Sequence, residues 1–121
     1  MAARKSADEA GTEAAVNEVR LVGRLATEAE DRELPSGDSL VTFRLVVDRP
    51  EGGASRQKVD ALECAAWGAR VRRSVTSWRP GDTVEVSGSI RRRFFRTPLG
   101  AASRVEVEVA TARLIRRART A

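Results

Sequence analysis

The chain has 121 residues, of which 41% are hydrophobic and 32% are charged. This length and composition predict one globular domain with a single core. No stretch approaches the ~18 consecutive apolar residues of a transmembrane helix, and the first residues lack the apolar segment of a signal peptide, so we expect a cytoplasmic protein.

The residue types that most enzymatic and metal chemistry requires are scarce. The sequence contains no His, and Cys64 is its only cysteine, which excludes an internal disulfide and an ordinary zinc site. The missing His also removes the commonest general base, and no Gly-rich phosphate loop, nucleophile elbow or paired acidic motif is present. We therefore expect a protein that is not an enzyme and uses no metal or other cofactor.

Basic residues are concentrated in the later part of the chain. The first 40 residues contain 5 Lys and Arg against 9 Asp and Glu, whereas the remainder contains 17 against 8. Nearly all of the basic residues are arginines, and a guanidinium both pairs with phosphate and stacks on a base. This favours a polyanionic partner. The alternative is that a genome rich in GC codons simply places arginines on solvated surfaces.

The first half of the chain predicts a tail and two strands. Residues 1–15 are rich in Ala, Glu, Ser and Gly without a period and predict a flexible tail. Residues 17–26 and 40–49 alternate as half-buried strands do, and the polar segment between them predicts a loop or short hairpin. The side chains expected to face the core are Val19, Leu21 and Leu25 in the first strand and Val41, Phe43, Leu45 and Val47 in the second.

A third strand and a helix follow after a break at residues 50–55. The helical spacing begins after Gly68, and Pro80 and Gly81 end it. In the third strand, residues 56–67, we expect Leu62, Cys64 and Ala66 to face inward and Ala61, Glu63, Ala65 and Trp67 to face outward. On the helix, Val71, Val75 and Trp78 share one face, so we expect Trp78 to be a core residue.

Two further strands complete the pattern, at residues 83–95 and 103–115, with a turn at 96–102. Their inward residues are expected to be Val84, Val86, Ile90, Val105, Val107 and Val109, and their outward residues Ser89, Arg91, Arg93, Phe95, Arg104, Glu106 and Glu108. Three strands, a helix and two strands is the element order of the OB-fold. We therefore predict an all-β, five-stranded Greek-key barrel with one helix between strands three and four.

Three sequence blocks resemble bacterial single-stranded DNA-binding proteins of the replication type. They are NEVRLVGRLATEAEDRELPSGDSLVTFRLVVDR, ALECAAWGARV and WRPGDTVEVSGSIRRRFF, and the resemblance covers roughly residues 16–115. It implies an OB-fold domain over those residues, between the tail at 1–15 and a short basic tail at 116–121. It also implies homo-oligomers, dimers or tetramers, that bind single-stranded DNA without sequence preference in replication, recombination or repair, associated with the nucleoid.

The resemblance also implies a set of DNA-binding residues. Trp67 and Phe95 match aromatic side chains that stack on bases, so Trp67 is expected to lie outside the core, although core packing is the alternative for it. The arginines that match positions facing DNA, or share the face of Phe95, are Arg24, Arg32, Arg44, Arg91 and Arg93.

The chain departs from the family pattern at several positions. Ala61 stands where the family commonly has a Trp, Glu63 stands where it has an Arg, and the loop after the second strand lacks an aromatic residue. Two missing stacking platforms would lower the affinity by ~10² or more. The sequence ends in a basic segment, so we expect a short form that lacks the family's acidic carboxy-terminal tail and does not dock partners through an acidic tip.

These departures leave other functions open. Ala61 and Glu63 favour an OB-fold subunit that binds another protein and has weakened nucleic-acid binding. The same surface would also suit RNA. An enzyme of unrecognised type is the remaining alternative.

Overall fold

The computed structural model describes residues 13–119, and this part of the chain folds into six strands and one short helix. The predicted tail at residues 1–15 lies largely outside the described residues. Within them, no helix is long and apolar enough to cross a membrane. The elements are β1 Val19–Leu25, β2 Glu30–Glu33, β3 Ser39–Asp48, β4 Val59–Ala66, α2 Ala69–Thr76, β5 Thr83–Thr97 and β6 Gly100–Arg116.

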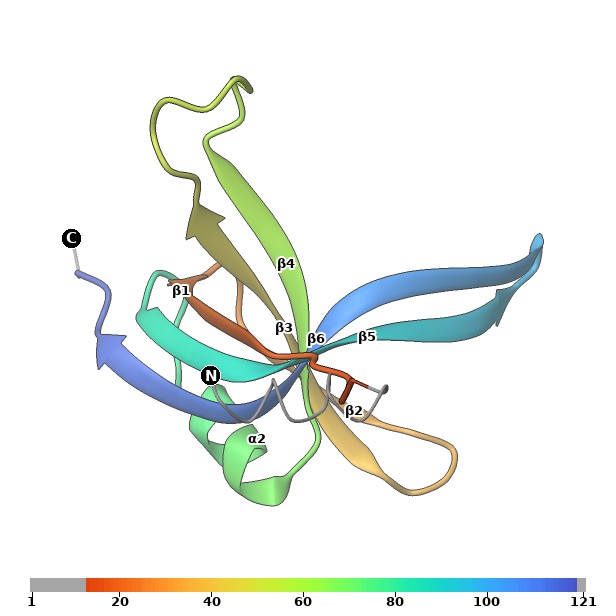
Figure 1. The fold of residues 1–121 in the computed structure, drawn as a ribbon. Helices are drawn as coiled ribbons and strands as arrows, with labels where there is room; N and C mark the ends of the chain where they lie inside the picture. The colour runs from red at the N-terminus through yellow and green to blue at the C-terminus, as the bar shows by residue number, and fades with distance from the viewer. Residues whose placement is uncertain (1–12, 120–121) are drawn as a thin grey trace.

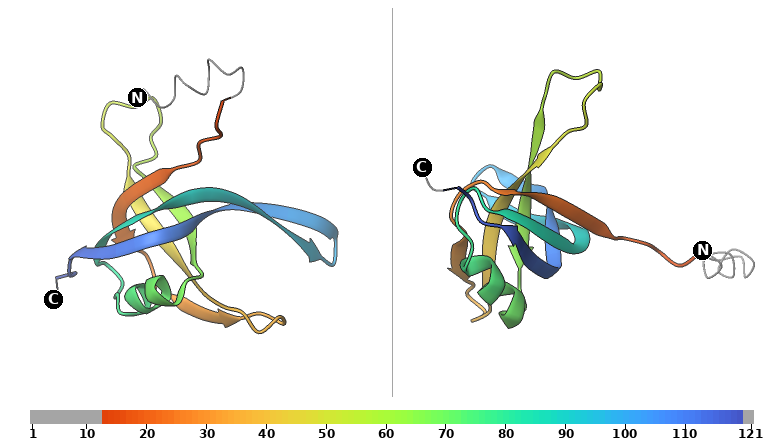
Figure 2. Two further views of the ribbon diagram at one scale, coloured as in Figure 1. Left: turned by 60° about the horizontal axis from the view of Figure 1, so that its bottom comes forward. Right: turned by 90° about the vertical axis from the view of Figure 1, so that its left-hand side faces the viewer.

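Five of the strands close into a barrel (Figure 1). β1 pairs with β5, β5 with β6, β6 with β4 and β4 with β3, and a short contact of β1 with β3 closes the ring. All of these pairings are antiparallel except β4 with β6. The helix α2 lies between β4 and β5 in the chain and packs against β3, β4 and β6 (Figure 2). The predicted five-stranded OB-fold with one helix is confirmed.

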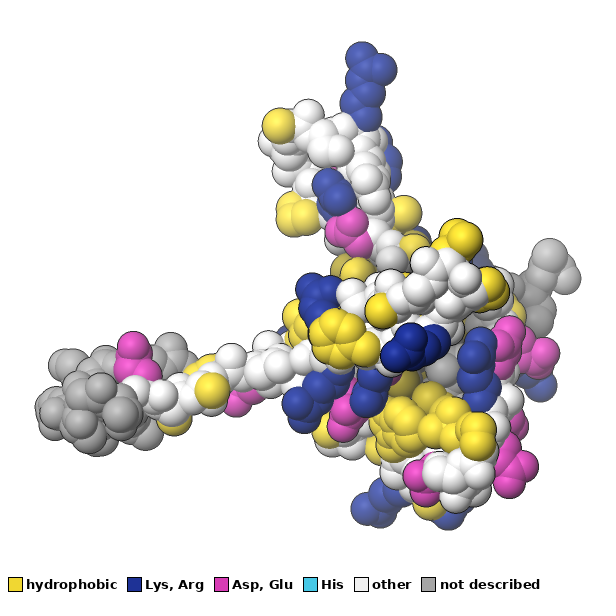
Figure 3. Space-filling model, turned by 90° about the vertical axis from the view of Figure 1, so that its right-hand side faces the viewer, with side chains coloured by type: hydrophobic (Ala, Val, Ile, Leu, Met, Phe, Trp, Pro, Cys, Tyr) yellow, Lys and Arg dark blue, Asp and Glu magenta, His cyan; other side chains and the backbone are white. Residues whose placement is uncertain are grey.

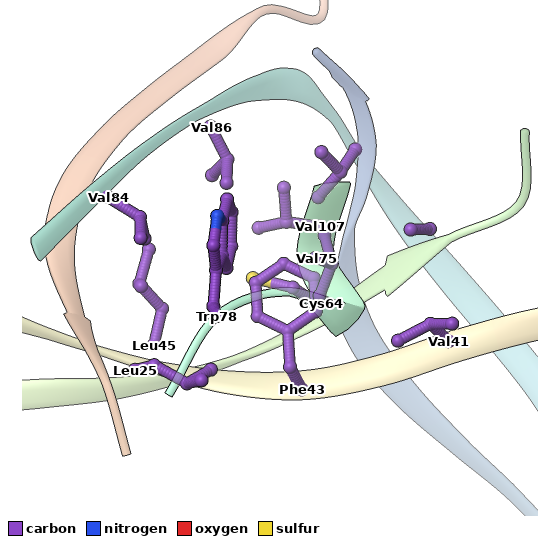
Figure 4. Close-up of a cluster of buried hydrophobic side chains, with 12 residues drawn as sticks. Leu25, Val41, Phe43, Leu45, Cys64, Val75, Trp78, Val84, Val86 and Val107 are labelled. Carbon is purple, nitrogen blue, oxygen red and sulfur yellow. The ribbon is translucent and has the colours of Figure 1, made fainter. Parts of the chain in front are cut away.

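The barrel interior is filled by the side chains that alternation had placed inward. Trp78 is 4% exposed and meets Phe43 edge to face, with ring centroids 5.7 Å apart and planes at 87° (Figure 4). The prediction that Trp78 is a core residue is therefore confirmed. The buried cluster consists of Leu25, Val41, Phe43, Leu45, Cys64, Ala66, Val75, Trp78, Val84, Val86, Val107 and Val109.

Two glycines permit close backbone contacts that hold the barrel closed. A Cβ on Gly23 would lie 2.4 Å from the carbonyl oxygen of Val46, where β1 crosses β3. A Cβ on Gly88 would lie 1.9 Å from the carbonyl oxygen of Glu108, beside an irregularity in the pairing of β5 with β6. Any side chain at either position would push the paired strands apart.

Three hairpins extend from the barrel, and two of them, β2–β3 and β5–β6, can be compared in detail with the predicted elements. The segment before β3 forms the short strand β2, which is the hairpin alternative of the sequence prediction. A turn lies within the predicted range of residues 96–102 but is shorter than predicted, because pairing continues through Thr97 and Gly100 and leaves only Pro98 and Leu99 as the turn. β5 and β6 therefore form a long arm, visible at the right of Figure 1.

Four side chains lie in environments opposite to those predicted. Ile90 and Val105 have the predicted orientation but are each 48% exposed, because they lie on the arm beyond the barrel. Ala65 is fully buried because its side chain is only a methyl group and lies between two longer side chains on the neighbouring strands. These are Thr42 on β3 and Glu108 on β6. Glu106 is only 7% exposed, because two arginine side chains pair with it.

A buried carboxylate ties the end of β6 to the turn before β5. Asp82 is 1% exposed and accepts hydrogen bonds from the backbone N–H groups of Arg79 and Ala118, at 2.9 and 2.7 Å, and from the Arg117 guanidinium at 2.9 Å. Burial alone would raise the pKa of Asp82, but these three donors outweigh it and hold the pKa below its usual value. The ionised carboxylate thus stabilises the fold.

We expect Asp82→Asn to lower the free energy of unfolding by about 1–3 kcal/mol near neutral pH, because one buried donor loses its acceptor. A lowered pKa in the folded state gives stability that is present above the unfolded pKa of ~3.9 and is lost as the pH falls through the folded pKa. The difference between the two proteins should therefore shrink in acid. Urea unfolding at neutral and acidic pH measures it.

The matched control is Asp60→Asn, which removes a carboxylate that is paired with Arg49 and whose side chain is 41% exposed. Its effect should stay below about 1 kcal/mol. Equal effects of the two substitutions would contradict the structural role given to Asp82.

Candidate nucleic-acid interface

Trp67 lies at the junction between β4 and α2, with its ring on the outside of the barrel but not freely exposed. It is half-buried, and the guanidinium carbon of Arg93 lies 5.2 Å from its ring centroid. Its Nε1 is buried, and no described residue accepts a hydrogen bond from it. The Arg72 side chain donates to the Trp67 carbonyl oxygen at 3.0 Å, which fixes the backbone at the junction. Packing and Arg93, rather than a hydrogen bond, thus hold the indole.

Arg93 reaches Trp67 from the neighbouring arm and is anchored there by two carboxylates. Its guanidinium bonds Glu106 at 3.0 Å and Glu108 at 3.1 Å. Arg91, two residues earlier on β5, pairs with the same Glu108 at 3.3 Å. Because both carboxylates come from β6, the antiparallel register of the arm sets the position of Arg93 over the indole.

Phe95 lies further out on the same face of the arm and is 40% exposed. The Arg104 guanidinium carbon lies 5.4 Å from the Phe95 ring centroid, and Arg104 also approaches Glu106 at 3.9 Å. A row of contacts therefore connects the two predicted stacking rings. It runs from Trp67 through Arg93, Glu106 and Arg104 to Phe95.

Arg104 also belongs to a hollow of about 400 Å³ on the outer face of the β2–β3–β4 sheet. This hollow brings Arg32 and Arg44 together with it. Arg44 pairs with Glu63 across β3 and β4 at 2.6 Å, and Arg32 pairs with Glu30 at 3.5 Å. The hollow is lined by Thr27, Glu28, Glu30, Arg32, Thr42, Phe43, Arg44, Glu63 and Arg104.

Arg24 does not line this hollow. It lies where β1 crosses β3 and forms two hydrogen bonds with Asp48, at 3.1 and 3.2 Å. These bonds raise the pKa of Arg24 and lower the pKa of Asp48, because each stabilises the charged form of its partner. The structure thus brings six of the seven predicted residues onto one connected surface and places Arg24 at a separate ion pair.

All five predicted arginines are paired with carboxylates, which the sequence prediction did not anticipate. Exposed ion pairs contribute only about 0–1 kcal/mol each. A phosphate group could therefore replace the carboxylate at little loss. The pairs offset much of the positive charge of the surface.

The sequence prediction also missed Arg104 as a member of this surface. The alternation of Arg104 with Glu106 and Glu108 was visible in the sequence, but its position opposite Arg93 on β5 was not. Cys64 has no place in the surface. It is 2% exposed, and burial raises the pKa of its thiol to about 12, so the thiol stays protonated. Among residues 13–119, no cluster of His, Cys, Asp or Glu is suited to a metal ion.

Comparison with known proteins assigns the chain to a family. Residues 16–115 match the model of the "Single-strand binding protein family". The chain belongs to this family. A curated relative is single-stranded DNA-binding protein 3 of Listeria innocua, which is 33% identical over 79 residues, or 64% of this chain and 49% of that protein. Single-stranded DNA-binding protein A of Bacillus subtilis is 29% identical over 86 residues, or 70% of this chain and 50% of that protein.

The chain thus spans about half the length of the curated relatives that it matches. Among solved structures, the Plasmodium falciparum SSB in complex with single-stranded DNA matches this chain with a TM-score of 0.67 at 23% sequence identity. The match covers 87% of this chain and 97% of that one. This structural similarity supports the OB-fold that we assign to this chain from its strand pairings.

We expect Arg93→Ala to make the Trp67 indole more accessible, because the side chain that covers one face of the ring is removed. Acrylamide quenching of fluorescence measures this in a Trp78→Phe background, where Trp67 is the only emitter. The slope of the quenching plot should rise. Arg92→Ala, on the other face of the arm, should leave the slope unchanged, and equal slopes for both variants would contradict the assigned contact.

Proposed function

We propose that this protein is a non-catalytic, sequence-independent binder of single-stranded DNA. The observation that carries the proposal is the single connected surface on which Arg93 and Arg104 link the Trp67 ring to Phe95. Rings of this kind stack on any base, and guanidinium groups beside them pair with phosphates, so no base-edge contact is needed. The names of the family and of its relatives support the same ligand.

The DNA path that we propose crosses the outer face of β3, β4 and β6 onto the arm. Bases would stack on Trp67 and Phe95, and phosphates would contact Arg32, Arg44, Arg91 and Arg93. Arg24 would serve as an outlying phosphate contact. Ala61 is exposed on β4 and offers no ring to a base, so Trp67 has no aromatic neighbour on its own strand.

A homo-oligomer is also part of the proposal. β1 pairs with β5 along Val19–Arg24 but with β3 only at Arg24 and Leu25, so one edge of its first half has no ladder partner among the described residues. Val22 on this strand is 41% exposed. An open strand edge is a template for pairing with a second copy. We place the protein at the nucleoid, in replication, recombination or repair.

We expect Trp67→Ala to weaken binding of a fluorescently labelled oligo-dT by about 5- to 150-fold, since one stacked base contributes ~1–3 kcal/mol. Fluorescence anisotropy at two salt concentrations measures the change. The logarithm of the affinity of the unmodified protein should fall with the logarithm of salt concentration by ~0.7 per phosphate contacted.

Two outcomes would contradict the proposal. One is the absence of salt-dependent binding to oligo-dT. The other is an unchanged affinity in Trp67→Ala, which would instead favour a subunit that binds another protein. A preference for RNA over DNA of the same sequence and salt would reassign the ligand.

We expect Glu63→Gln to strengthen oligo-dT binding by about 1.5- to 5-fold, because Arg44 no longer has to exchange an ion pair of ~0.2–1 kcal/mol for a phosphate. The same anisotropy titration measures it. The matched control is Glu18→Gln, which makes the same charge change at an exposed position before β1, outside the proposed path. An equal gain in both variants would show that only net charge matters.

A further inference from the structure

The arm formed by β5 and β6 has two faces with different chemistry. On the face that carries Phe95, the basic residues Arg91, Arg93 and Arg104 are paired with Glu106 and Glu108. The opposite face carries Ile90, Arg92, Phe94 and Arg96, since side chains alternate along a strand. Their cross-strand neighbours are Val107, Val105, Ser103 and Ala101, and no acidic residue is among them.

Phe94 is the most exposed ring among the described residues. It is 77% exposed, against 40% for Phe95, and Leu99 at the turn is 99% exposed. Figure 3 looks onto the free end of the arm, where hydrophobic and basic side chains lie next to one another. An exposed aromatic ring and two neighbouring arginines are the groups that bind a polyanion carrying flat rings.

Among the described residues, the arginines on this face form no ion pair with a carboxylate. Arg92 donates to the Ser103 hydroxyl at 3.1 Å, and within residues 13–119 neither Arg92 nor Arg96 forms an ion pair. A phosphate would meet them without displacing an acidic side chain. The charge of this face therefore favours a nucleic acid over an apolar protein surface or a second copy of this chain.

We propose that the Phe94 face of the arm is a second single-stranded DNA contact, with a base stacked on Phe94 and phosphates on Arg92 and Arg96. This inference rests on the proposed function, because it extends the DNA path from the Phe95 face around the arm. The strand then contacts both faces of the β5–β6 hairpin. The second contact requires more nucleotides than the surface around Trp67 alone.

The length of the oligonucleotide provides the test. With an oligo-dT of about 8 nucleotides, within the range of one OB-fold site, Phe94→Ala should bind as the unmodified protein does. With an oligo-dT of about 30 nucleotides, Phe94→Ala should bind about 5- to 150-fold more weakly, as expected for one lost stacked base. Trp67→Ala should be weakened at both lengths.

Four further variants sharpen the result. Leu99→Ala removes an even more exposed apolar side chain that cannot stack, and this variant should bind both oligonucleotides normally. Phe94→Trp should restore the affinity for the long oligonucleotide and add a fluorescence signal that this DNA quenches. Arg92→Ala and Arg96→Ala should each lower the salt dependence for the long oligonucleotide by ~0.7.

The outcomes separate this inference from the proposed function. If Trp67→Ala is weakened but Phe94→Ala binds the long oligonucleotide normally, the second contact is overturned while the proposed function stands. If neither oligonucleotide binds the unmodified protein, the proposed function itself fails. A weakened Phe94→Ala whose oligomeric state also changes in sedimentation would assign Phe94 to an interface between copies and overturn the inference.

Discussion

The parallel pairing of β4 with β6 is the constraint on which the surface depends. It spans three pairs, from Cys64 with Val107 to Ala66 with Val109, and it joins the two halves of the barrel. Because β4 ends at Ala66, this pairing places Trp67 beside the root of the β5–β6 arm, where Arg93 covers its ring. The same strands bury Cys64, Ala66, Val107 and Val109 in the core. Core packing and the position of the candidate stacking ring therefore have one origin.

Carboxylates hold the arginines of this surface in place before any ligand arrives. Glu63, Glu106 and Glu108 fix Arg44, Arg93 and Arg91 in defined positions, and Glu106 is nearly buried in doing so. Such pairing orders long side chains in advance, but each phosphate must then compete with an acidic group. The proposed DNA path thus combines an ordered surface with a reduced positive charge. On the opposite face of the arm, the arginines have no acidic partner among the described residues. Their positive charge is therefore not offset, but no carboxylate holds them in place.

Local patterns predicted most of the fold, because a barrel strand buries every second residue. Alternation identified the core residues of all five barrel strands, and the steps of four and three from Val71 to Trp78 identified the helix face that reaches the core. The length of the arm was not predicted, since Arg96 and Thr97 pair only because β6 lies opposite them. The burial of Glu106 likewise depends on Arg93, which lies 13 residues away in the chain. For the site, alternation put the rings and arginines on outward faces, but their carboxylate partners follow from strand register, which no local pattern contains.

The central claim is that single-stranded DNA meets the outer side of Trp67 while Trp78 stays in the core. Two-dimensional ¹H–¹⁵N NMR spectra test it directly, because the protein has two Trp residues and each gives one indole N–H signal. On addition of oligo-dT, the account predicts that the Trp67 indole signal shifts or broadens while the Trp78 signal, from a side chain that is 4% exposed, stays in place. A Trp67 signal that does not change while backbone signals elsewhere shift with saturating DNA would contradict the account.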